Sequence, residues 1–313
     1  MRLPGAGTAL KLTRADSLPA GAGLPATLTC GGPLAPLRQT TPQRKGGAAV
    51  MMIFPVWMRV YLTAVTAVFG LVLGSGLGCL ADRMARGESW ARGRSHCDSC
   101  GHTLAAADLV PVFSWLFLRG RCRYCGARIG AESTLRELLL AALLAAVLWR
   151  FGPTAEALAA MVLLCCLFCL SIVDAKTLLI PNRFLVIAAA ARVVWLLAFG
   201  GGAFALLRAL ATGAVLAGVI LLLALLLDRV LKKESMGGGD LKLLAVLGLY
   251  FTPWECLLLL ILSCLAALVF ALLRPRLRNA AGELPFGPFL SAAAALTLLI
   301  GAPVTGWYLS FFL

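Results

Sequence analysis

The feature that most restricts the fold of this chain is a series of apolar runs, each about as long as a bilayer-spanning helix. Short charged or Gly/Pro-rich segments separate these runs, and 61% of the 313 residues are hydrophobic against 13% charged. Soluble domains are roughly 45–50% apolar and 25% charged, whereas a membrane-spanning helix needs about 20 apolar residues. The sequence therefore predicts an all-α polytopic membrane protein.

About eight transmembrane helices are expected. Seven apolar segments are close to spanning length and lie near residues 60–80, 136–150, 155–173, 184–200, 203–227, 254–273 and 287–312. An eighth, 241–251, is short for a crossing on its own. Helices are expected because lipid offers no hydrogen-bond partner to an open backbone.

The net charge of +14 is distributed in a way that indicates membrane topology rather than nucleic-acid binding. Arginines crowd the segment 81–136, and further Lys/Arg clusters follow Asp174, precede and follow Asp240, and occupy residues 274–278. The alternate loops carry little positive charge, as the positive-inside rule requires. Segment 81–136 and both aspartates are therefore expected in the cytoplasm. Both chain ends then lie outside, so the number of crossings must be even and segment 241–251 must cross.

The first fifty residues do not fit this topology. They are rich in Gly, Pro, Ala and Thr, and their basic residues fall on the side that the rule calls external. They lack the apolar core of a signal peptide. One interpretation is a disordered extension; the other, which we favour, is a start at Met51 or Met52. The expected organisation is then a first transmembrane helix (51–82), a cytoplasmic domain (83–135) and a seven-helix membrane domain (136–313).

Two Cys-x-x-Cys pairs lie in the predicted cytoplasmic domain, 21 residues apart. This spacing is close to that of a zinc ribbon, and four thiolates suit a closed tetrahedral metal site. Gly101 and Gly126 follow the pairs, as tight knuckle turns need. A redox or empty thiol site is the alternative, although the cytoplasm disfavours disulfides. The predicted zinc ligands are Cys97, Cys100, Cys122 and Cys125.

Two aspartates lie at the ends of very apolar stretches. Asp174 follows the run Leu163–Val173, and Asp240 follows three glycines, 237–239. Carboxylates at membrane depth are costly, and two on one side of a bilayer suggest an acid/base pair sharing a proton. The alternative to a catalytic role is that both aspartates are ordinary residues at the cytoplasmic boundary of the membrane. Their neighbours Lys176 and Lys242 would then extend their side chains to the membrane–water interface. The glycines, which permit close backbone approach and unusual φ/ψ angles, favour the functional interpretation.

These motifs resemble a known family. The run Gly237-x-Gly239-Asp240 is similar to the Gly-x-Gly-Asp signature of intramembrane aspartyl proteases, and Asp174 with Lys176 and Pro181-Asn182 resembles the first catalytic segment of bacterial type IV prepilin peptidases. The resemblance covers about residues 51–313. It includes both cysteine pairs, the stretch Pro111-Val112-Phe113-Ser114-Trp115-Leu116 with Arg119-Gly120-Arg121, and Pro285-Phe286-Gly287-Pro288. Asp98 departs from the usual Pro after the first cysteine, and residues 74–80 lack the usual Asn.

The resemblance implies a function and assigns roles. Asp174 and Asp240 would be catalytic, supported by Gly237, Gly239, Lys176 and Lys242, and the four cysteines would hold structural zinc. The enzyme would cut the leader from type IV prepilins or pseudopilins at the cytoplasmic face of the bacterial inner membrane. It would also methylate the new N-terminus with S-adenosylmethionine. Membrane lipid and prepilins are the expected partners, and nucleic acid is not. The resemblance does not identify which prepilin is cut, which pathway the enzyme serves or how many chains assemble.

Two other classes of function are weighed against this one. A proton-coupled membrane transporter could use the aspartates as proton carriers, and a non-enzymatic membrane assembly factor could use a zinc domain for docking. A transporter built from inverted repeats should have two similar halves. The only repeat in this sequence is the short Asp-x-Lys motif, which occurs at Asp174 and at Asp240. An assembly factor gives no reason for Gly-x-Gly-Asp.

Overall fold

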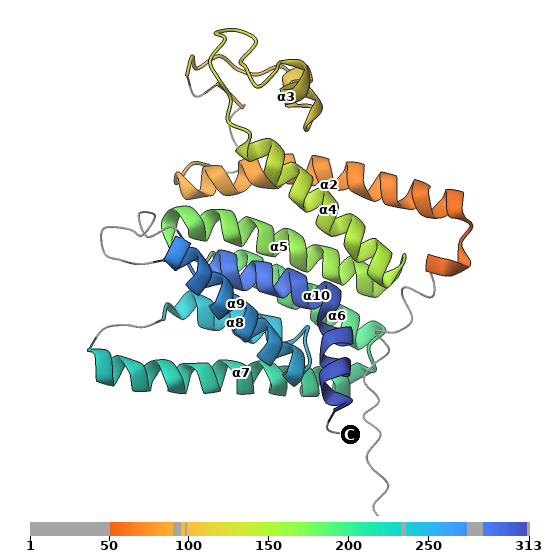
Figure 1. The fold of residues 1–313 in the computed structure, drawn as a ribbon, viewed down its shortest axis with the longest axis vertical. Coiled ribbons are helices and arrows are strands. Elements are labelled where there is room, and N and C mark those ends of the chain that lie inside the picture. Colours follow the sequence, from red (N-terminus) through yellow and green to blue (C-terminus); the bar gives the residue numbers. More distant parts are fainter. Residues whose placement is uncertain (1–50, 90–94, 98, 233–235, 274–283, 312–313) are drawn as a thin grey trace, which may run out of the picture. The chain divides into compact units, whose positions relative to one another are not determined.

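The computed structural model describes residues 51–89, 95–97, 99–232, 236–273 and 284–311 (Figure 1). Within these residues the chain is almost entirely helical, and its β-structure is limited to two isolated bridges. The sequence-based prediction of an all-α membrane fold is confirmed. The expected extension or alternative start at residues 1–50 lies outside the described residues.

Each of the eight predicted apolar segments contains a helix. These are α2 (Val56–Ala85), α4 (Glu132–Phe151), α5 (Ala155–Thr177), α6 (Asn182–Ala198), α7 (Gly202–Leu231), α8 (Gly238–Gly248), α9 (Pro253–Leu273) and α10 (Gly287–Leu309). Five of them, α2, α5, α7, α9 and α10, are long and apolar enough to cross a membrane. Helix α8 has 11 residues, or about 17 Å, against an apolar bilayer core of roughly 30 Å. The total of eight crossings stays a prediction.

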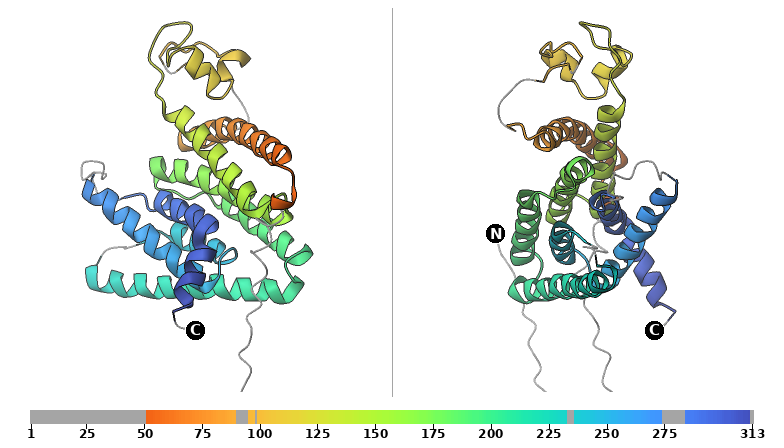
Figure 2. Two further views of the ribbon diagram at one scale, coloured as in Figure 1. Left: turned by 45° about the vertical axis from the view of Figure 1, so that its right-hand side comes forward. Right: turned by 90° about the vertical axis from the view of Figure 1, so that its left-hand side faces the viewer.

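Helix α5 is the central helix of the membrane region and packs against α2, α4, α6 and α10 (Figure 1). In its most apolar window 67% of the residues are buried, against 6% for α7. The core is made mainly of Leu, Ala, Val and Phe side chains from α4, α5, α8 and α10. Helix α7 lies at the margin of these helices (Figure 2) and leaves its leucines and valines exposed, as expected where lipid replaces protein contacts.

Helices α2 and α4 approach each other closely at two glycines. A Cβ added to Gly70 would lie 2.6 Å from Ala141 Cα, and one added to Gly74 would lie 2.8 Å from Glu137 Cα. This is the small-xxx-small packing common between membrane helices. It fixes the α2–α4 pair and the position of Glu137 within it.

The predicted cytoplasmic domain has little regular structure. It contains the short 3₁₀-helix η1 (Ala106–Leu109) and the helix α3 (Phe113–Phe117). Trp115 donates from Nε1 to the Ile129 carbonyl at 3.2 Å and packs against Gly120. Its indole therefore joins two parts of a domain that is too small to fold on a core of packed helices alone.

Candidate active site and metal centre

Asp174 lies in the last turn of α5 and is only 5% exposed. Its Oδ2 accepts a hydrogen bond from the backbone N–H of Gly287 at 2.9 Å. Gly287 is the first residue of α10, where helix N–H groups lack intrahelical partners and the helix dipole favours an anion. The start of α10 therefore orients the Asp174 carboxylate.

Gly287 is a site residue to which sequence reasoning gave no role. A Cβ at this position would lie 2.6 Å from Asp174 Oδ2, so any other residue would displace the carboxylate. The signal was present in the motif Pro285-Phe286-Gly287-Pro288, which formed part of the family resemblance. The partner of that motif could not be read from the sequence, because 113 positions separate Gly287 from Asp174.

Asp240 is the third residue of α8, and its N–H donates to the Gly237 carbonyl at 3.1 Å. Its Oδ1 is buried and has no hydrogen-bond partner among the described residues. Asp240 interacts electrostatically with Asp174, so the structure brings the two predicted carboxylates into one region. A buried carboxylate oxygen without a partner is rare in folded proteins and calls for a functional explanation.

The glycines before Asp240 adopt ordinary backbone angles. None of residues 237–239 has a positive φ, so the unusual φ/ψ angles that glycine permits are not used here. The reason is that they begin a helix, with Gly237 as an extended N-cap at φ −68°. Close approach is confirmed at Gly239, where a Cβ would lie 3.0 Å from Ile180 Cβ. At Gly237 an added Cβ would make only an ordinary contact, 3.6 Å from Asp240 Oδ2.

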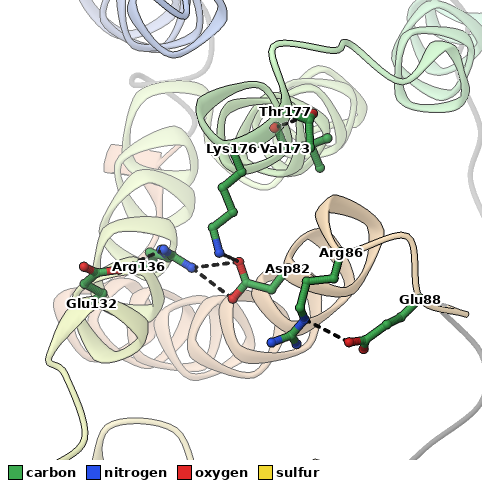
Figure 3. Close-up of polar contacts among 8 residues, drawn as sticks. All are labelled: Asp82, Arg86, Glu88, Glu132, Arg136, Val173, Lys176 and Thr177. Atoms are coloured by element: carbon green, nitrogen blue, oxygen red, sulfur yellow. Dashed lines mark hydrogen bonds and ion pairs between the residues drawn. The ribbon is translucent and has the colours of Figure 1, made fainter. Parts of the chain in front are cut away.

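The two predicted supporting lysines connect helices. Lys176 Nζ donates to Asp82 Oδ1 of α2 at 2.8 Å, and Arg136 of α4 reaches the same carboxylate at 3.2 Å (Figure 3). Lys242 Nζ donates to Asn182 Oδ1 at the start of α6, at 3.3 Å. Asp82 is a second residue that sequence reasoning missed, and nothing near it in the sequence marks it.

The four predicted zinc ligands converge. The sulfur atoms of Cys97, Cys100, Cys122 and Cys125 all lie within 4.8 Å of one another. Tetrahedral zinc with Zn–S bonds of about 2.3 Å places its sulfurs about 3.8 Å apart. The separation of Cys97 Sγ and Cys125 Sγ is 4.0 Å. The residues present therefore fit a Cys₄ metal site.

Both cysteine pairs adopt the same knuckle turn. Gly101 and Gly126 have φ values of +69° and +71°, as expected for turn glycines. Their N–H groups donate to the carbonyls of Cys97 at 2.8 Å and Cys122 at 3.0 Å. The backbone N–H groups of Cys100 and Ser99 lower the pKa of the Cys97 thiol to about 6. This favours the thiolate at Cys97, and the thiolate is the form of cysteine that binds metal.

Comparison with known proteins matches two family models. The model of the bacterial peptidase A24 N-terminal domain matches residues 68–151, and that of the type IV leader peptidase family matches residues 161–272. The first match contains the four cysteines and the second contains both aspartates. No solved structure matches the chain significantly.

Curated relatives extend the match over most of the chain. A protein of Burkholderia pseudomallei (strain 1026b) named prepilin leader peptidase/N-methyltransferase is 40% identical over 237 residues, covering 73% of this chain and 74% of its own. Proteins of the same name from Pseudomonas aeruginosa and Bacillus subtilis are 38% and 31% identical, covering 69% and 79% of this chain and 75% and 98% of their own. With both family models and these relatives in agreement, the chain belongs to the type IV leader peptidase family.

Proposed function

We propose that this protein is a membrane aspartic endopeptidase that removes the leader peptide of type IV prepilins or pseudopilins and N-methylates the new N-terminus. The observation that carries the proposal is the pair Asp174 and Asp240, which lie in one region of the structure within a family of leader peptidases. Relatives named prepilin leader peptidase/N-methyltransferase support both activities.

In the proposed peptidase reaction, the ionised carboxylate of the pair takes a proton from water while the protonated one polarises the scissile carbonyl. The water oxygen attacks the carbonyl carbon. The leaving nitrogen then takes up a proton, and the C–N bond breaks to release an amine and a carboxylic acid. Asp174 is oriented by the Gly287 N–H, whereas Asp240 has a buried oxygen, Oδ1, without a hydrogen-bond partner among the described residues. Because the two groups interact, they would titrate as a pair.

We place the active site at the cytoplasmic face of the bacterial inner membrane. Basic residues gather at the helix ends that carry the aspartates, with Lys176 two residues after Asp174 and Lys242 two residues after Asp240. Arg136 joins Lys176 on Asp82. This charge distribution supports a cytoplasmic location by the positive-inside rule.

Zinc is the metal that we assign to the four-cysteine cluster, with a structural role. Its four ligands are all cysteines, which leaves no coordination position for substrate. Zinc would hold the two knuckles together in a domain with a very small core. S-adenosylmethionine is the methyl donor that we assign to the methyltransferase activity.

The transporter and the assembly factor receive no support from the comparisons, which agree on a peptidase family. The decisive experiment is co-expression of the protein with a candidate prepilin, followed by mass spectrometry of the prepilin N-terminus. We expect loss of the leader and a mass increase of one methyl group. The matched control is a variant carrying both Asp174→Asn and Asp240→Asn. Full-length prepilin in cells whose membranes contain the wild-type protein would refute the proposal.

A further inference from the structure

The short helix α3 carries an apolar face that the described residues leave largely uncovered. Phe113, Leu116 and Phe117 occupy positions i, i+3 and i+4 of this helix, so their side chains share one face. They are 54%, 62% and 82% exposed. An exposed apolar patch rimmed by polar residues marks a contact with a membrane or with another protein. Neither the pair of aspartates nor the four cysteines account for this patch.

The opposite side of the same segment packs inside the four-cysteine domain. Trp115 donates from Nε1 to the Ile129 carbonyl at 3.2 Å, and a Cβ added to Gly120 would lie 3.1 Å from its indole ring. Trp115 therefore serves the packing of the domain itself. The three exposed side chains point away from that packing, so they are available to something outside the domain.

Helix α3 begins at the depth of the membrane helices. The Val112 N–H, just before α3, donates to Glu137 Oε2 of α4 at 2.8 Å. Glu137 is in turn level with Gly74, since a Cβ added to Gly74 would lie 2.8 Å from Glu137 Cα. Gly74 belongs to α2, which is long and apolar enough to cross a membrane, and Leu138 and Leu139 beside Glu137 are exposed as lipid-facing side chains are. The apolar face of α3 therefore starts at the boundary of the lipid-facing surface.

Two arginines follow this face directly. Arg119 and Arg121 are exposed, and neither forms an ion pair with the residues that the structure describes. Arg123, by contrast, pairs with Asp108 at 2.9 Å. Apolar side chains beside uncompensated basic residues are typical of segments that lie in the membrane interface, where anionic headgroups attract each positive charge. Charge and depth together favour a negatively charged lipid surface as the partner.

We propose that α3 and its two arginines dock the four-cysteine domain onto anionic phospholipid at the membrane interface. Phe113, Leu116 and Phe117 enter the boundary between headgroups and acyl chains. Arg119 and Arg121 bind the lipid phosphates, which suit the planar guanidinium group. The docking concerns only how the domain meets the membrane, so it does not depend on the proposed peptidase activity.

Photo-crosslinking of the purified full-length protein tests the contact directly. The protein is reconstituted into vesicles of phosphatidylcholine and phosphatidylglycerol in equal amounts, with a photoreactive phenylalanine analogue in place of Phe117. The matched control carries the analogue in place of Tyr124, an aromatic residue of the same domain whose ring packs on His102. We expect mass spectrometry to find lipid attached at position 117 and not at position 124. The analogue at Leu116, on the same face, serves if the first variant fails to fold.

The lipid captured at position 117 also tests the role of the arginines. We expect several-fold more phosphatidylglycerol than phosphatidylcholine, and equal amounts of the two once Arg119→Gln and Arg121→Gln are combined. Arg183→Gln is the control, because Arg183 is an exposed arginine at the start of α6 and should leave the preference unchanged.

Three results would overturn the docking proposal. The first is equal or absent lipid attachment at positions 117 and 124, which would mean that α3 has no particular contact with the bilayer. The second is attachment at position 117 to a second copy of the chain in place of lipid. The third is equal capture of the two lipids while both arginines are present.

Discussion

Lys176, which lies two residues after Asp174, donates a hydrogen bond to Asp82 at 2.8 Å. This bond joins the end of α5 to the end of α2. Arg136 adds α4 to the same carboxylate (Figure 3). The side chains of these three residues are 24–44% exposed, so water screens their attraction in part. The network nevertheless ties the segment that carries Asp174 to the N-terminal domain.

Substitution of Asp82 by Asn should lower both stability and cleavage rate. The change leaves Lys176 and Arg136 without their shared anion, and we expect a loss of about 1 kcal/mol, since the pair is partly exposed. Glu88→Gln is the control, because it removes an exposed surface pair with Arg86. Thermal unfolding in detergent and a prepilin cleavage assay give the two measurements. Equal effects from both substitutions would show that the network does not support the site.

Loss of either aspartate should abolish cleavage. Asp174→Asn and Asp240→Asn each remove one member of the acid/base pair, and residues that act as a unit are strongly non-additive. The double variant is therefore expected to be no worse than either single one. Immunoblots of membranes serve as the control for insertion and abundance. Cleavage near the wild-type rate in either single variant would contradict the assignment.

Gly287→Ala should reduce cleavage by about 100-fold, the effect that a displacement of roughly 1 Å can have on a catalytic group. The new Cβ would lie 2.6 Å from Asp174 Oδ2 and would push the carboxylate off the N-terminus of α10. Gly306→Ala in the same helix is the matched control, because its Cβ would meet no atom within 4 Å. The rates at which the two variants process prepilin test whether the contact between Gly287 and Asp174 matters for catalysis. Normal processing by Gly287→Ala would show that the contact has no catalytic role.

Gly239→Leu should damage cleavage about as severely as loss of Asp240. Its Cβ would press on Ile180 at 3.0 Å, and the rest of the leucine side chain would force the start of α8 away from the Asp174 segment. Gly238→Leu is the control, since a Cβ there meets no atom within 4 Å. An in vivo processing assay compares the two. If both variants process prepilin fully, the glycines act only as a flexible link.

The purified protein should contain one zinc ion per chain, and Cys122→Ser should remove it. Cys122 is buried within the cluster, whereas Cys264 is exposed on α9 and its replacement by Ser should leave the metal in place. Elemental analysis provides the measurement. Because structural zinc supplies folding free energy, chelation should also make the four-cysteine domain sensitive to protease. A metal-free protein that stays stable and active would rule out a structural metal.

The sequence by itself predicted the helices, the cluster of four cysteines and the two aspartates that we propose as the catalytic pair. Apolar runs of spanning length leave the backbone no alternative to the helix in lipid, and each Cys-x-x-Cys pair with its glycine is a local turn. Asp174 and Asp240 were found through short motifs at the ends of such runs. All of these signals lie within a few neighbouring residues, which is why one sequence suffices to predict them.

Only the tertiary structure decided which groups meet. The bond between Asp174 and Gly287 joins residues 113 positions apart, and the bond between Lys176 and Asp82 joins residues 94 apart. The close approach of Gly239 to Ile180 likewise depends on how separate segments pack. Hydropathy and motif spacing describe an element and its immediate neighbours. Contacts between distant elements depend on side-chain packing, which no local pattern encodes.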